Sequence, residues 1–531
     1  MIFNASHITK NIYKMPSFSL VHWADVVAQK LAEKKRKHVL ATAITPSGPI
    51  HVGNLREILT TEAVYRALKD IGIKAKLIYI GDTFDPLRKL YPFLPAHYEK
   101  YIGMPLSEIP CPCDKHENYA THFLEPFLES LREIGVKPEV YLAHELYKKG
   151  VYNDSIKIAL DKSEKIREII KKISQRDLPA GWMPFNILCK KCGRMDGEIK
   201  KYEYPMATYI CKSCKYEGET DLREGGAGKL PWRVDWPARW KIFNVTFEAF
   251  GKDHAASGSS WDTGRVISKE IFEYEPPMPF VYEFIHLKGR GAMHGSTGIA
   301  VSAEEVLKII PPEVLRFLFM KYEPNRHIEF DTGYGLFDLV DEYDRYEKIY
   351  FGIEEETTGT KDAKRVYELS QPYKKPSEFP KTIPYRHLAV VSQIGRNFDE
   401  VVEILGRKEN LKKYDINRLK ERYEKIVYWL RNYSPEEIKF KLYYEKPDIF
   451  LEEEERFFLS ELKKKFEEID WDAEKIHTVI HETSKKTGIK TKKAFETVYK
   501  IMLAKKNGPR AGYFLQSLGK NFVLKRVEEF I

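Results

Sequence analysis

The sequence predicts an α/β fold that is interrupted by a cysteine-containing insertion and followed by an all-α region. Short apolar runs alternate with helical patterns in residues 21–90 and again in residues 231–310. All six cysteines lie between these two stretches, in residues 91–230. From residue 311 onward, amphipathic helix patterns continue to the end of the chain. Because strands that alternate with helices indicate a parallel sheet, the two α/β stretches are expected to form one domain.

Length and composition are those of a multidomain globular protein. The chain has 531 residues, more than one hydrophobic core accommodates, so roughly two to four domains are expected. Hydrophobic residues make up 43% of the chain, and there is no run of about 18 apolar residues and no signal-peptide pattern. We therefore expect a cytoplasmic protein without a membrane partner. The net charge of +9 excludes a wholly basic binder and suits one RNA-facing surface.

The first predicted unit is a strand, a turn and a helix. Residues 1–20 match no structural pattern and are interpreted as an N-terminal extension, and a helix is expected over Val21–Glu33. The apolar run His38–Ile44 predicts a buried parallel strand, and the apolar spacing over Leu55–Lys69 predicts a helix. The turn Thr45–Asn54 therefore lies at the carboxyl edge of the sheet, where α/β proteins bind nucleotides.

This turn has the residues of a phosphate-binding site. Gly48 and Gly53 allow the backbone to approach a ligand closely. N–H groups at the start of the next helix attract phosphate, and His51 and Asn54 lie three residues apart there. The other interpretation is an ordinary Gly/Pro turn before a helix.

A second strand ends in an acidic loop. Lys74–Ile80 is the predicted strand, and its loop shares the sheet edge with the first turn. Asp82 and Asp85 in this loop provide two carboxylates that could hold an ammonium group. The alternative interpretation is an Asx-type turn before Pro86.

The first cysteine cluster lies early in the insertion. Two thiols and two imidazoles follow one another closely, at Cys111, Cys113, His116 and His122. They would complete a tetrahedral zinc site, although the spacing is unusual. Asp114 and His97 are alternative ligands. Without a secretory signal, metal binding is favoured over disulfides, and the remaining alternative is reduced surface cysteines beside unrelated histidines.

The other four cysteines form two CxxC pairs, at Cys189, Cys192, Cys211 and Cys214. The aromatic residues Tyr202, Tyr204 and Tyr209 between the pairs predict a small β-hairpin, so the pattern is that of a zinc ribbon. Four thiolates fill a tetrahedral shell, which makes the predicted site structural rather than catalytic. The flanking lysines either contact a phosphate backbone or form a solvated face.

A tryptophan-rich segment leads back into the α/β pattern. Trp232, Trp236 and Trp240 either pack in a core or line a pocket. A strand is then predicted over Val245–Phe250, and a helix over Trp261–Phe272.

The turn between this strand and helix is a further candidate for the site. It contains Asp253 and His254, which therefore lie at the same sheet edge as His51. The alternative for His254 is a helix cap or a hydrogen-bonded core histidine. Phe280–Leu287 is the last predicted strand, and the glycine-rich loop Lys288–Gly298 follows it.

The remaining chain is predicted to be helical. Residues 311–375 begin with a helix and include a polar passage that contains Pro and Gly, and residues 376–531 continue as amphipathic helices. We interpret the first part as a connecting domain and the second as an all-α domain. A helical repeat module with another partner is the alternative.

These motifs resemble, in the same order, those of the class I lysyl-tRNA synthetases of archaea and some bacteria. Pro46–Asn54 resembles the HIGH signature, Asp85–Lys89 the Asp-Pro-Leu-Arg-Lys segment, and Gly251–His254 the Gly-x-Asp-Gln/His turn. Ala292–Ser296 occupies the place of the KMSKS signature but lacks both signature lysines. Gly508–Gly512 resembles the C-terminal region of the family.

The resemblance implies a Rossmann-type class I synthetase catalytic domain with a zinc-binding insertion, a stem-contact-like connecting domain and an all-α C-terminal anticodon-binding domain. It also implies ATP-dependent attachment of L-lysine to the 2′-hydroxyl of tRNA(Lys) through lysyl-adenylate, with Mg²⁺ and one or two structural Zn²⁺ ions. A monomer is expected. Relatives of this fold need bound tRNA before they activate the amino acid, and the resemblance suggests the same here.

The resemblance also implies roles for individual residues. Contacts with ATP are expected from Gly48, His51, Gly53, Asn54, Asp253, Lys288, Met293, His294, Gly295 and Ser296. The lysine pocket is expected to draw on Thr45, Asp82, Trp232, Trp236, His254 and Tyr282. Without the signature lysines, the leaving pyrophosphate needs other positive charge, for which Lys288, Arg290 and His294 are the candidates. His51 and Asn54 should then contribute more of the triphosphate contact than in most of the class.

Three other functions are compatible with parts of the pattern. A glutamyl-tRNA synthetase would require basic residues rather than carboxylates in the amino-acid pocket. A zinc-ribbon RNA-binding protein with a vestigial nucleotide site would account for the missing signature lysines. A nucleotidylyltransferase shares the sheet, but small-molecule adenylyl transfer needs no large helical tail.

Overall fold

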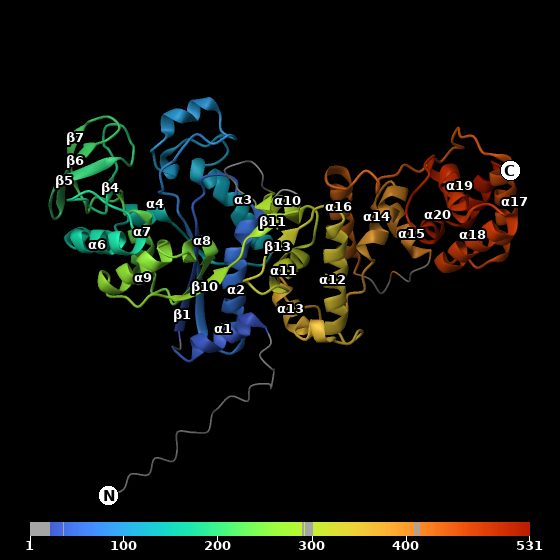
Figure 1. Ribbon diagram of the computed structural model, residues 1–531, viewed down its shortest axis with the longest axis horizontal. Coiled ribbons are helices and arrows are strands. Elements are labelled where there is room, and N and C mark those ends of the chain that lie inside the picture. The colour runs from blue at the N-terminus through green and yellow to red at the C-terminus, as the bar shows by residue number, and fades with distance from the viewer. Residues whose placement is uncertain (1–21, 35–36, 289–290, 293–300, 408–410, 412–414) are drawn as a thin grey trace, which may run out of the picture.

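The computed structural model describes residues 22–34, 37–288, 291–292, 301–407, 411 and 415–531. The molecule is elongated, with a β-ribbon at one end and the last helices at the other (Figure 1). The predicted extension over residues 1–20 lies outside the described residues.

Five parallel strands form the central sheet, in the order β10–β9–β1–β2–β3. Their bounds are Lys37–Ile44 for β1, Lys74–Gly81 for β2, Glu139–Leu142 for β3, Phe247–Gly251 for β9 and Met278–Tyr282 for β10. The chain runs outward from β1 to β3 and returns on the other side of β1 as β9. The strand order therefore reverses between β1 and β9, where α/β sheets bind ligands at the carboxyl ends. The predicted Rossmann-type domain is confirmed.

Helices cover both faces of this sheet. The first layer packs against Leu77 and Tyr79 of β2, and the second against Ile78 and Ile80. Because successive side chains of a strand point to opposite faces, an almost continuous apolar strand is needed to hold both layers. The first layer comprises α1 (Trp23–Ala32), α2 (Leu55–Asp70) and α3 (Tyr119–Glu133), and the second α7 (Trp232–Phe243) and α9 (Ser260–Glu270).

The predicted last strand over Phe280–Leu287 is wrong as a single strand. β10 ends at Tyr282, and β11 (Ile285–Leu287) joins a separate sheet with β12 (Gly291–Ala292) and β13 (Ile328–Phe330). The N–H of Glu283 donates to the carbonyl of Pro324 (2.8 Å), so the backbone leaves the parallel sheet between the two strands. The sequence predicted no strand after residue 311, and β13 shows that this prediction is wrong.

The predicted insertion over residues 91–230 includes part of the parallel sheet. β3 pairs with β2 as the edge strand, and its four residues are exposed or half-buried. No apolar run marks it in the sequence, because an edge strand need not be covered on both faces.

The rest of the insertion consists of short helices and the ribbon. The ribbon sheet has the order β7–β6–β5–β4–β8, and its β5–β6 pair is the predicted hairpin. β8 pairs with β4 just before α7 begins, so the ribbon joins the parallel-sheet domain there. The bounds are η2 Ala96–Tyr101, η3 Leu106–Glu108, α4 Ala143–Lys148, α5 Asn153–Asp161, α6 Ser163–Ser174, β4 Asn186–Ile187, β5 Gly197–Glu203, β6 Met206–Cys211, β7 Glu217–Asp221 and β8 Gly228–Lys229.

The C-terminal helices form two packed groups, seen side by side in Figure 1. The apolar core beneath α2 continues without a break to Trp429 in α16, whereas α17–α21 have a core of their own. The predicted boundary at residue 376 therefore does not coincide with a break in the core. The bounds are α8 Lys252–Ala255, α10 Ala303–Leu307, α11 Pro312–Met320, α12 Gly335–Tyr350, η5 Thr358–Thr360, α13 Ala363–Ser370, α14 Tyr385–Ile394, α15 Phe398–Gly406, α16 Ile416–Asn432, α17 Glu453–Glu468, α18 Ala473–Thr487, α19 Thr491–Leu503, α20 Ala511–Leu518 and α21 Lys520–Glu528. Across the described residues, no helix combines the length and apolarity that crossing a membrane requires.

Candidate active site and metal centres

A cavity of about 530 Å³ opens at the reversal point of the sheet. The loops after β1, β2 and β9 and the end of β10 meet around it. The structure brings these predicted site residues together in its wall: Thr45, His51, Gly53, Asn54, Asp82, Trp232, Asp253, His254 and Tyr282. Four polar side chains outside the predicted site set also line it, those of Glu57, Asp85, Arg88 and Ser260, and Asp85 is the possible ammonium ligand of the acidic loop.

Three predicted residues lie away from this wall. A Cβ at Gly48 would meet the ring of Phe93 at 2.6 Å, so this glycine accommodates a side chain of the insertion. The side chain of Lys288 is 61% exposed and pairs with Asp331 at 3.0 Å. Trp236 packs behind the pocket. Met293, His294, Gly295 and Ser296 lie outside the described residues, as does Arg290.

The turn after β1 is fixed by its own polar groups. The Asn54 Oδ1 accepts a hydrogen bond from the backbone N–H of His51 at 3.1 Å, and residues 52–54 form the single-turn helix η1. The N–H of Val52 donates to the carbonyl of Val301 (2.9 Å), and His51 forms an isolated antiparallel β-bridge with Ser302. The oxygen of Asn54 thus shapes the turn, while the same side chain still carries an NH₂ donor.

Glu57 in the first turn of α2 is the most informative residue that sequence reasoning missed. Its Oε1 accepts the backbone N–H of Ala43 at 2.9 Å, and its Oε2 accepts the hydroxyl of Tyr282 at 3.1 Å. Burial raises the pKa of Glu57 to about 8. A carboxylate in the first turn of a helix that begins at the sheet edge was the signal that could have revealed it.

We expect the binding of a cationic ligand at Glu57 to release a proton. With a pKa of about 8, Glu57 is mostly protonated at pH 7 in the empty pocket, and an ammonium group stabilises the ionised form. Binding at pH 7 should therefore release close to one proton, and affinity should rise with pH up to about 8. Calorimetric titration in two buffers with different ionisation enthalpies measures this release. No proton release would contradict an ammonium at Glu57.

Asp82, the predicted ammonium ligand, already has partners from its own chain. Lys229 lies 3.0 Å from its Oδ1, and Arg239 donates to its Oδ2. Although burial opposes ionisation, these two cations lower the pKa of Asp82 to about 2. Because its charge is balanced within the protein, Asp82 is poorly placed to bind a ligand ammonium directly.

The three tryptophans divide between core and pocket. Trp232 stacks on Trp236 with ring centres 5.1 Å apart, and His254 lies 6.0 Å from Trp232. The indole N–H groups of Trp236 and Trp240 both donate to Glu248, at 3.0 and 2.6 Å, and both rings are buried. Trp232 is therefore part of the pocket wall, Trp236 stacks behind it, and Trp240 packs against Trp236.

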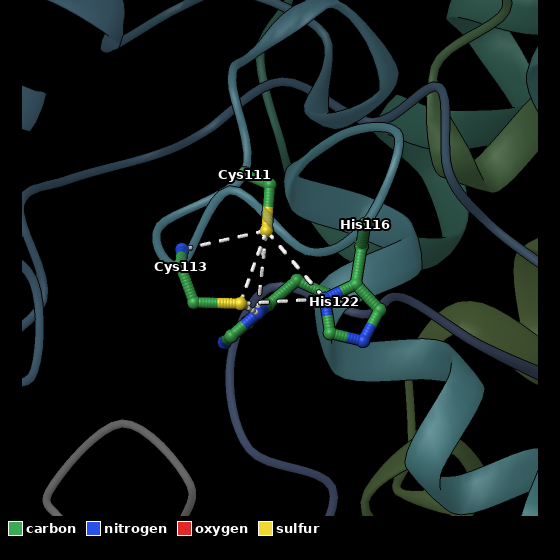
Figure 2. A group of neighbouring side chains, drawn as sticks. All are labelled: Cys111, Cys113, His116 and His122. Atoms are coloured by element: carbon green, nitrogen blue, oxygen red, sulfur yellow. Dashed lines mark hydrogen bonds between the residues drawn. The ribbon is translucent and has the colours of Figure 1, made fainter.

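The first predicted metal cluster is assembled in the structure (Figure 2). The Cys111 and Cys113 sulfurs are 3.5 Å apart, and the Nδ1 atoms of His116 and His122 lie 3.2–3.6 Å from them. Around tetrahedral zinc, ligand atoms lie roughly 3.5–3.8 Å apart, so this donor set fits the ion. The Glu125 carboxylate is 3.7 Å from the other nitrogen of His116 and can orient that ring.

The second cluster lies in the ribbon. The four cysteine sulfurs lie within 4.8 Å of one another, with Cys189 to Cys214 and Cys192 to Cys211 both at 3.6 Å. Gly193 and Lys215 have φ values of +68° and +58°, which turn the chain back after each pair. Four sulfurs in this arrangement could hold one zinc ion with no open position.

The sheet order, the pocket at its reversal point and the turn after β1 are those of a class I aminoacyl-tRNA synthetase, and the family match establishes that class. More narrowly, the chain belongs to the family of class I (K) tRNA synthetases, whose model matches residues 21–373. Residues 410–531 match the anticodon binding domain.

Lysine–tRNA ligases of other organisms are similar in sequence to nearly the whole chain. The lysine–tRNA ligase of Methanocaldococcus jannaschii is 45% identical over 536 residues, which cover 96% of this chain and 100% of the relative. Those of Archaeoglobus fulgidus and Picrophilus torridus are 43% and 42% identical and cover 96% of this chain and 99% of each relative.

Proposed function

We propose that the protein attaches L-lysine to tRNA(Lys) in an ATP-dependent reaction. The lysine carboxylate attacks the α-phosphate of ATP, which gives lysyl-adenylate and pyrophosphate. The 2′-hydroxyl of the terminal adenosine then takes the lysyl group and releases AMP. Positioning and neutralisation of the growing phosphate charge supply most of the rate, so no strong base is required.

One observation carries the choice of lysine: the pocket has a carboxylate that no cation of the described residues pairs with, and a separate hydroxyl acceptor. Glu57, which accepts from Tyr282, is the carboxylate, and Thr45, whose hydroxyl donates to Asp85, is the acceptor. Lysine has two ammonium groups, and we assign its ε-ammonium to Glu57 and its α-ammonium to the Thr45 side. The ring of Trp232 faces the same cavity and can cover the methylene chain. Glutamate would place a second carboxylate near Glu57, which disfavours the glutamyl alternative.

The nucleotide would occupy the other part of the cavity. His51, the NH₂ group of Asn54 and the backbone at Gly53 are proposed to contact the triphosphate, whose Mg²⁺ accompanies ATP. The glycine-rich loop Lys288–Gly298 is proposed to add positive charge, from Lys288 and His294, and backbone N–H donors. The anticodon of the tRNA would bind in residues 410–531, which match the anticodon binding domain. We propose that both cysteine clusters hold structural zinc, and that the enzyme acts as a monomer in the cytoplasm, where tRNA is charged.

Amino-acid-dependent exchange between ATP and pyrophosphate tests this function. We expect exchange with lysine and none with glutamate, and we expect it to require tRNA. Exchange with glutamate alone would contradict the proposal. No exchange and no charging by the unmodified chain would favour an RNA-binding protein with a vestigial nucleotide site.

We also expect His51→Ala to reduce kcat/KM for ATP by at least about tenfold, or roughly 1.4 kcal/mol of transition-state stabilisation. The second signature lacks its lysines, so His51 should carry a larger share of the triphosphate contact. Steady-state aminoacylation measures the loss, with His97→Ala as a control because His97 does not line the cavity. A smaller loss would mean that other groups hold the triphosphate.

A further inference from the structure

A buried network of five charged side chains borders the pocket, and only Asp85 among them has a part in the proposed amino-acid site, through its contact with Thr45. Lys229 is at its centre, with its Nζ 2.6 Å from Asp85, 3.0 Å from Asp82 and 3.5 Å from Asp235. Arg239 pairs with Asp82 and Asp235 on the other side. None of these five side chains is more than 11% exposed.

One contact connects this network to the cavity. Lys229 holds the Oδ1 of Asp85, and the Oδ2 of the same carboxylate accepts a hydrogen bond from the Thr45 hydroxyl at 3.1 Å. An ionised carboxylate can only accept, so the single hydroxyl proton of Thr45 is directed at Asp85. The lone pairs of the Thr45 hydroxyl oxygen are then left to accept a hydrogen bond from a ligand in the cavity that Thr45 lines.

The charge balance makes this arrangement depend on Lys229. Three carboxylates face two cations in the network, so it has a net charge of −1. Without Lys229 the net charge becomes −2, and a buried carboxylate in that situation takes up a proton. Protonated Asp85 could donate to Thr45, whose own proton would then turn toward the cavity. Arg88 is 3.9 Å from Asp85 and 73% exposed, so it is a weak substitute.

We propose that Lys229 is a positioning residue for the amino-acid site: it keeps Asp85 an acceptor and thereby fixes the Thr45 hydroxyl to accept from the α-ammonium of lysine. The inference rests on the proposed function. Lys229 lies on β8, the edge strand of the ribbon sheet. The ribbon thus supplies the cation that sets the hydrogen-bond direction at the catalytic pocket.

Aminoacylation at saturating tRNA provides the test. We expect Lys229→Met to raise KM for lysine at least about tenfold while KM for ATP changes less than about threefold. In Lys229→Ala, added propylammonium should restore about tenfold in kcat/KM for lysine, because it replaces the missing ammonium in the cavity left by the side chain. In the unmodified enzyme the same amine should only inhibit. Lys212→Met, an exposed substitution on the ribbon, is the matched control and should not change either KM.

A double variant separates the proposed positioning role of Lys229 from a purely structural role. The double variant Lys229→Met with Asp85→Asn restores the network charge of −1 but lacks the carboxylate acceptor. We expect its thermal unfolding to approach that of the unmodified chain while KM for lysine stays high. Recovery of KM in this variant, equal losses for ATP and lysine, or no rescue by the amine would overturn the proposal. If the single variant does not fold, the double variant and the amine rescue decide. Absence of lysine charging by the unmodified chain would instead contradict the proposed function.

Discussion

Glu57→Gln is expected to lower kcat/KM for lysine by about two orders of magnitude or more. Glu57 is half-buried at the cavity wall, and its carboxylate accepts hydrogen bonds from the Ala43 backbone and the Tyr282 hydroxyl. Truncating one partner of a desolvated charge pair costs about 2–5 kcal/mol, which corresponds to roughly 30-fold to several thousand-fold. Glutamine preserves the shape of the side chain, removes its charge and replaces one acceptor oxygen by an NH₂ donor, which the Tyr282 hydroxyl can accept by turning its own proton away. The effect should appear in KM for lysine, measured by steady-state aminoacylation.

The same helix provides a matched control for this substitution. Glu62 is also buried in α2, but it pairs with Arg316 at 2.7 Å and lies outside the cavity. Glu62→Gln should destabilise the fold, because it leaves a buried guanidinium without its charge partner, yet KM for lysine should stay within about threefold of the original value. Equal changes in KM for both variants would show that the loss at Glu57 comes from the fold rather than from ligand binding.

Loss of the ribbon metal is expected to be the largest effect on stability. A structural zinc site contributes about 10–16 kcal/mol of apparent binding free energy, and much of this is folding free energy. We expect the unmodified chain to contain two zinc ions and Cys189→Ser to contain one. The ribbon of the variant should unfold at a lower temperature. Lysine charging should be lost with it, because β8 belongs to the ribbon sheet and Trp232 of the pocket wall follows β8 closely in the chain. Metal analysis and thermal melting measure both effects.

Ser213→Ala is the control for the ribbon substitution. Ser213 lies between Cys211 and Cys214, and its hydroxyl contacts Asp196 rather than the cysteine sulfurs. It should keep both ions and the original melting temperature. Cys111→Ser should remove the other ion and leave the ribbon folded. An unmodified chain without zinc, or a Cys189→Ser variant with two ions, would contradict the assignment of metal to these clusters.

Features that depend on neighbours in the chain were predictable. The strands β1 and β2, the helix α2 and the turn between β1 and α2 follow from apolar spacing and from Gly and Pro at the turn. The CxxC pairs and the 111–122 cluster were also recognised, because ligand spacing is a local constraint. β3 was missed because it is a short edge strand, and the break between β10 and β11 because both segments are apolar.

The choice among carboxylates could not be made from the sequence. Asp82 follows a strand as a ligand residue would, yet Lys229 at the end of the insertion and Arg239 beyond it balance its charge. Lys229 reaches Asp85 across 144 residues of chain, and no local pattern announces such a pair. In the sequence, Glu57 is one more polar residue of an amphipathic helix, and only the fold places the Tyr282 hydroxyl and the Ala43 backbone beside it.

The sequence by itself therefore determined the fold class, the family resemblance, the turn after β1 and the two cysteine clusters, because each depends on residue types at short spacing. Only the tertiary structure decided which of the acidic side chains at the cavity are paired with cations of the protein. The reason is electrostatic: a buried carboxylate is available to a substrate ammonium only when no cation of the protein already compensates it, and that depends on residues that are distant in sequence and close in space.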